Sequence, residues 1–178
     1  GSARVDLFAA TTGRLTLTVK NSANTNILNY TTPSSTFSPR TWYNLLIAYD
    51  LASSTFQVYK NSTSVSVASA VMSNDTTEAQ TKAGVGSNSA GTSKWKGYVA
   101  DVFYNPTYAD ISSSTVRQKF ISAGGKPVDL GASGSTPLGV QPTVYLSGAF
   151  SSWHTNKGTG GGFTVTGAIN ATSSSPSN

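Results

Sequence analysis

The chain has 178 residues and a formal net charge of +5, and only 11% of its residues are charged, against roughly 25% in an average soluble protein. Ser and Thr make up 52 residues, and there is no Cys, one Glu and one His. This composition excludes disulfides, zinc–thiolate sites and cysteine nucleophiles, and it leaves little material for acid–base catalysis.

The elements expected in the first half of the chain follow a period of two, which is typical of strands. The clearest case is 14–20, where Leu15, Leu17 and Val19 alternate with Thr. The segment 42–50 is apolar in both phases and predicts a central strand covered on both faces. Strand 55–60 follows after a loop of hairpin length. Weaker strand candidates in this half are 4–8, 26–30, 63–68 and 83–87.

The second half continues with strands at 97–105 and 143–147, and with an alternating strand at 163–169. One short helix is expected over 113–122, with Ser112 or Ser113 as its N-cap. Gly124 and Gly125 would end this helix. About ten short strands separated by turn residues predict an all-β sandwich or barrel.

The expected organisation is a single domain over 3–170. Residues 1–2 look like the remnant of a cleaved tag, and 171–178 look like a flexible tail or linker. No apolar run approaches the roughly 20 residues needed to span a bilayer, so we expect no membrane insertion. The basic residues are scattered except for Lys94 and Lys96. Because a phosphate footprint needs clustered charge, we expect no nucleic-acid partner.

Two segments resemble a known family. Thr41–Ser62 reads TWYNLLIAYDLASSTFQVYKNS and Ala83–Tyr104 reads AGVGSNSAGTSKWKGYVADVFY. Both are similar to hairpins of the concanavalin A-like lectin/glucanase superfamily, particularly its laminin-G-like branch. The C-terminal runs GKPVDLGASGSTP and GTGGGFTVTGAI are similar to the ends of laminin-G-like proteins in phages, prophages and bacteria. The resemblance implies a jelly-roll β-sandwich of two antiparallel sheets with one short helix.

Glycoside hydrolysis, known among the glucanases, needs two carboxylates about 5–10 Å apart. The chain has Glu78 as its single Glu, and the family's Glu-rich catalytic strand is absent. A serine triad would need His154 as base, but no Gly-x-Ser-x-Gly motif occurs. We therefore expect no enzymatic activity, and no cofactor. Calcium stays an open alternative, since Asn74, Asp75 and Glu78 carry suitable oxygens but also fit a solvated loop.

Carbohydrate binding needs only an aromatic platform and polar side chains on loops that a rigid fold supports. The first candidate site is Trp95 with Asn88, Lys94 and Lys96, which would suit an acidic glycan. The second is Trp153 with His154 and Asn156. For both tryptophans the alternative is a structural ring at the edge of the core.

Composition and resemblance together lead to one expected function. It is a non-catalytic glycan-binding or adhesion module of a phage virion (tail fibre, spike or decoration) or of a bacterial surface protein. Its expected partners are bacterial surface or other glycans, with homo-oligomers or a larger virion assembly as a further expectation. The expected location is extracellular or on the virion surface. The competing hypothesis is a structural sandwich that serves assembly and binds no sugar.

Overall fold

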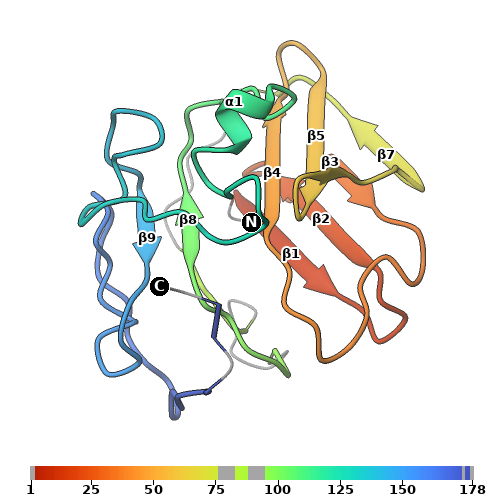
Figure 1. Cartoon of the computed structure of the whole chain (residues 1–178). Coiled ribbons are helices and arrows are strands. Elements are labelled where there is room, and N and C mark those ends of the chain that lie inside the picture. The colour runs from red at the N-terminus through yellow and green to blue at the C-terminus, as the bar shows by residue number, and fades with distance from the viewer. Residues whose placement is uncertain (1–2, 76–82, 88–94, 174, 177–178) are drawn as a thin grey trace. The chain divides into compact units, whose positions relative to one another are not determined.

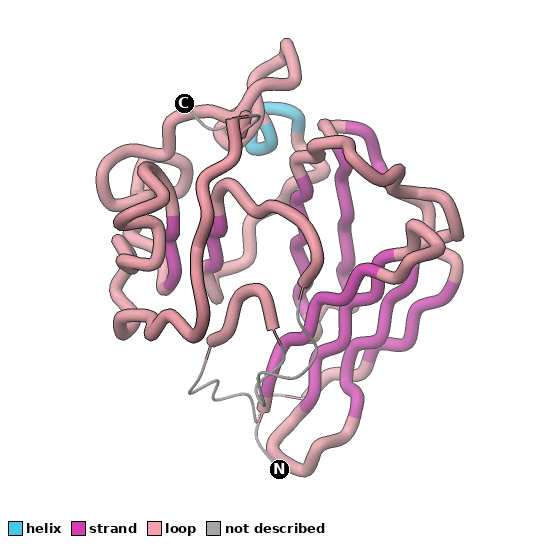
Figure 2. The backbone as a smooth tube through the Cα atoms, turned by 90° about the horizontal axis from the view of Figure 1, so that it is seen from below, coloured by secondary structure: helices cyan, strands magenta, loops and turns pink. Residues whose placement is uncertain are grey.

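The computed structural model describes residues 3–75, 83–87, 95–173 and 175–176, which form an all-β protein with almost no helix. The chain divides into two compact units, Gly1–Trp95 and Lys96–Asn178. Most of the regular strand lies in the first unit, whereas the described part of the second is largely loop (Figure 2). Each unit is described by itself below.

The larger sheet of the first unit has the antiparallel order β1-β2-β3-β7. Its strands are β1 (Arg4–Ala9), β2 (Leu15–Lys20), β3 (Asn26–Thr31) and β7 (Ser69–Met72). The alternation predicted for β2 is confirmed on its buried face, and Thr18 is buried as well. A register shift after Val19 bends the pairing of β2 with β3.

The smaller sheet has the antiparallel order β4-β5-β6. It consists of β4 (Leu45–Asp50), β5 (Thr55–Lys60) and β6 (Thr63–Ser64). The carboxylate of Asp50 closes the β4–β5 turn by accepting the Ala52 N–H at 3.0 Å and the Ser53 hydroxyl at 2.7 Å. These bonds, the one from Ser53 first, lower the pKa of Asp50 because they stabilise its ionised form.

The core of the first unit lies between these two sheets, which gives it the character of a β-sandwich. Leu17, Val19, Ile27, Leu28 and Tyr30 of the larger sheet cluster with Val58 of β5. The ring centroids of Tyr30 and Phe56 are 4.3 Å apart across the sheets. The strands of the two sheets run in clearly different directions (Figure 1).

The second unit is built around one short antiparallel pair, β8 (Val102–Tyr104) and β9 (Val144–Leu146). The Phe103 ring packs against Phe120 and Tyr145, at centroid distances of 5.3 and 6.5 Å. All three residues of β9 are buried. This aromatic cluster is the centre from which the loops of the unit extend.

Three strand predictions were wrong. The segment 42–50 does not form a central strand: β4 begins at Leu45 and is an outer strand of its sheet, with only Ala48 buried. The described residues 83–87 form no strand. Residues 163–169 form none either, because Gly167 adopts φ +99° and bends the chain, and no described strand lies paired beside it.

The predicted helix is much shorter than expected. Helix α1 covers only Ser114–Arg117, and although Ser113 is at its N-cap, its side chain makes no capping hydrogen bond. Ser and Thr fill its first positions, and both are weak helix formers. The following residues turn so that Phe120 and Ile121 are buried. Among the residues with described structure, no helix has the length and apolar character to cross a bilayer.

Candidate functional site

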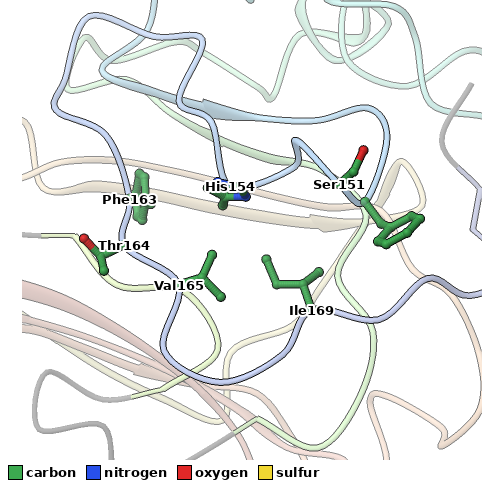
Figure 3. Close-up of a pocket in the computed structure, with 7 residues that line it drawn as sticks. Ser151, His154, Phe163, Thr164, Val165 and Ile169 are labelled. Carbon is green, nitrogen blue, oxygen red and sulfur yellow. The ribbon is translucent and has the colours of Figure 1, made fainter.

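An open hollow of about 550 Å³ lies among the C-terminal loops of the second unit. One side is made by Phe150, Ser151 and His154, and the other by the segment that begins at Phe163. Val165 and Ile169 point their side chains toward His154 (Figure 3). The residues lining the hollow are Phe150, Ser151, His154, Phe163, Thr164, Val165 and Ile169.

The loop that carries His154 is fixed by the side chain of Asn156. Its Oδ1 accepts the N–H groups of Tyr145 and Gly158 at 2.9 and 3.0 Å. Its Nδ2 donates to the carbonyl oxygens of Thr143 and Gly160 at 3.0 Å and to that of Gly161 at 3.2 Å. Because both ends of the amide are used, Asn156 ties this loop to the strand β9 region and has little capacity left for a ligand.

Lys157 adds a second tie to the same strand. Its ammonium group donates to the Ser147 hydroxyl at 2.8 Å and lies 5.5 Å from the centroid of the Tyr145 ring. Its backbone N–H also donates to the Tyr145 carbonyl at 2.9 Å. Burial raises the pKa of the Tyr145 phenol above its ordinary value. One wall of the hollow therefore rests on a well-anchored loop, although the loop contains no regular structure.

Trp153 is half-buried beside the hollow, and its indole N–H donates to the carbonyl oxygen of Ala100. The polar end of the ring is therefore engaged inside the unit. Trp153 is not among the residues that line the hollow, whereas its neighbour His154 is. The second predicted site thus separates into two loop-holding residues, Trp153 and Asn156, and one lining residue.

The first predicted site is only partly described. Trp95 is 45% exposed and its backbone N–H donates to the Gly86 carbonyl at 2.7 Å. Lys96 is exposed and belongs to the second unit. Asn88 and Lys94 lie outside the described residues. Glycan binding at Trp95 therefore stays a prediction, without a described cluster around the ring.

The sequence arguments did not select Phe150, Ser151 and Thr164 as site residues. Phe150 is 55% exposed, next to the Trp-His pair that drew attention to this loop. The cluster of three ring side chains within 150–154 is the signal that points to it. Phe163, Val165 and Ile169 belong to the segment 163–169 that was predicted as a strand, and they line the hollow instead.

No group of three or more metal-binding side chains occurs within the described part of the chain. Asp75 accepts a hydrogen bond from Asn21 Nδ2 at 2.8 Å, while Glu78 lies outside the described residues. The described residues therefore contain no cluster of side chains that would support the calcium alternative.

Comparison of the chain with protein-family models, with curated proteins and with solved structures found no match.

Proposed function

We propose that the chain is a non-catalytic carbohydrate-binding module and that the hollow in its second unit is the binding site. The observation that carries this proposal is the strongly exposed Phe150 ring in a hollow that also holds the His154 imidazole and the hydroxyls of Ser151 and Thr164.

The lining groups match the two needs of sugar recognition. The apolar face of a pyranose stacks on an aromatic ring, and the hydroxyls around its rim need donors and acceptors. Ser151 and Thr164 each offer both, and His154 adds ring nitrogens. The anchoring of the loop by Asn156 and Lys157 lowers the entropy that ligand binding would otherwise lose in ordering it.

The proposal is of binding without catalysis. Glycosidic bond cleavage requires two carboxyl groups on either side of the bond. The seven described residues that line the hollow include neither Asp nor Glu. A bound sugar would therefore meet hydrogen-bonding groups without a carboxyl pair, which suits recognition rather than glycosidic bond cleavage.

We extend the proposal to the fold family and the setting. Two observations support a concanavalin A-like jelly roll of the laminin-G-like branch: the β-sandwich character of the first unit, and the β4–β5 hairpin, which lies within the segment 41–62 that resembles this family. This family suggests a module exposed on a phage virion or a bacterial surface, facing bacterial surface glycans. A homo-oligomer or a larger assembly would present several such sites together.

The test is a glycan array rich in bacterial surface polysaccharides, probed with the purified chain and with the Phe150→Ala variant. We expect specific retention of the wild type and a loss of about tenfold in the variant, because a lost ring-stacking contact costs up to about 1.5 kcal/mol and about 1.4 kcal/mol corresponds to tenfold. Phe8→Ala is the matched control, since Phe8 is a 47% exposed phenylalanine of the first unit, outside the hollow. It should bind as the wild type does.

Two results would contradict the proposal. Binding that Phe150→Ala leaves intact would remove the site from the hollow. Silence of a folded wild-type sample over the whole array would favour the competing hypothesis, in which the sandwich serves assembly alone.

A further inference from the structure

We infer that the hollow selects a neutral sugar bearing an acetamido group, such as a 2-acetamido-2-deoxyhexose. This inference rests on the proposed function and adds the ligand class. It starts from the lining, in which four side chains are apolar and three are polar. The apolar ones are Phe150, Phe163, Val165 and Ile169.

Stacking of a sugar on an aromatic ring would leave the aliphatic side chains of Val165 and Ile169 without a contact. A hexose ring needs one aromatic face, which Phe150 provides. Val165 and Ile169 then still present methyl groups, both directed toward His154 (Figure 3). A plain hexose would place hydroxyls against them, and each hydroxyl would lose hydration without gaining a partner. A methyl group on the ligand would instead bury apolar surface there.

An acetamido group brings its methyl together with an amide. The N–H and C=O beside the methyl need an acceptor and a donor. The hydroxyls of Ser151 and Thr164 and the imidazole of His154 supply such groups around the same hollow. A 6-deoxy sugar carries a methyl without these polar neighbours, so it would use less of the site.

The charge of the lining decides against acidic sugars at this position. The described lining contains no Lys or Arg. The Lys157 ammonium is engaged with Ser147 and the Tyr145 ring. A uronate or sialate would therefore give up hydration without meeting a lysine or arginine side chain, which is costly. A neutral acetamido sugar has no carboxylate whose hydration would be lost.

The experiment compares chitotetraose with cellotetraose by isothermal titration calorimetry. The two share β-1,4 linkage and ring stereochemistry and differ only in the C2 substituent. We expect chitotetraose to bind about tenfold more tightly, from one buried methyl group and one or two net hydrogen bonds. Val165→Thr should reduce this preference several-fold, because it replaces an apolar methyl with a hydroxyl at nearly constant shape.

Val140→Thr is the matched control. Val140 is 49% exposed and Val165 39% exposed, both lie in the second unit, and only Val165 lines the hollow. Because both positions are exposed, neither change should unfold the protein, which circular dichroism can verify. The control should keep the full preference for chitotetraose.

Equal affinity for the two tetrasaccharides, or an unchanged preference in Val165→Thr, would overturn the inference. The glycan array run on the same preparation separates this failure from that of the proposed function. Glycans retained through Phe150 without an acetamido preference would leave glycan binding standing and remove only the ligand class. Silence toward every glycan would contradict both.

Discussion

At the scale of single residues, the polar side chains near the hollow have different roles. The side-chain amide of Asn156 makes five hydrogen bonds to backbone groups. His154, two residues earlier, faces the hollow. The residue types alone favoured both as ligand contacts. Only the bonding geometry separates the residue that builds the loop from the residue that is available to a ligand.

Asn156→Asp should destabilise the protein by about 3 kcal/mol, because it replaces a donor that serves three carbonyl oxygens with a carboxylate oxygen that repels them. Thermal unfolding measures the loss. Asn170→Asp is the control, since Asn170 is exposed, and should change stability by less than about 0.5 kcal/mol. If both variants melt alike, Asn156 does not hold the loop.

At the scale of elements, local patterning predicted several strands of the first unit. The alternating segment 14–20 forms β2, and the two strands predicted within 42–60 form β4 and β5. These elements follow from side-chain period and turn length, which are local properties. The position of β4 at the edge of its sheet depends on which distant segments pair with each other. Local patterns in a single sequence do not reveal this pairing.

The second unit shows where patterning stops being sufficient. Residues 163–166 alternate as those in 14–20 do, but Gly167 and Ala168 interrupt the pattern, and the segment forms no strand. A strand requires a neighbour for its backbone groups, and Gly167 turns the chain at φ +99°. The same apolar residues line a hollow instead. The candidate site was therefore only partly predictable, through the aromatic cluster around Trp153.

Gly158→Ala should destabilise the second unit by about 2 kcal/mol. A Cβ at this position would lie 2.5 Å from the Pro142 carbonyl oxygen and 2.6 Å from that of Thr143, so backbone must move. Chemical denaturation would report the change in unfolding free energy. Gly162→Ala is the control, because its Cβ meets open space, and it should be neutral or slightly stabilising. Equal effects would mean that the loop does not pack on residues 142–143.

At the scale of the whole molecule, the low charge of the chain leaves few groups that couple stability to pH. Tyr30 in the first unit and Tyr145 in the second are the buried phenols whose pKa values burial raises. A phenol with a raised folded pKa favours folding while it is neutral. Its contribution is full below the unfolded pKa of about 10 and is lost as the pH rises through the folded value.

Stability should therefore decline above about pH 10. Tyr30→Phe should make this decline shallower, because one of the two phenols no longer ionises. At neutral pH the variant should lose about 1 kcal/mol with the hydrogen bond from the Tyr30 hydroxyl to the Ser66 carbonyl oxygen, 3.2 Å in length. Melting temperatures from pH 7 to 11 test both effects. Parallel pH profiles for variant and wild type would rule out Tyr30 as a source of the alkaline decline.

The single histidine of the chain gives the most direct test of glycan binding in the hollow. His154 is the only His in the sequence and it lines the hollow, so its imidazole Hε1 proton gives one assignable NMR signal at the site. We would titrate the protein with the glycans that the array retains, beginning with chitotetraose. The account predicts a saturable shift of this signal, which Phe150→Ala abolishes. A retained glycan that leaves the His154 signal unmoved would contradict it.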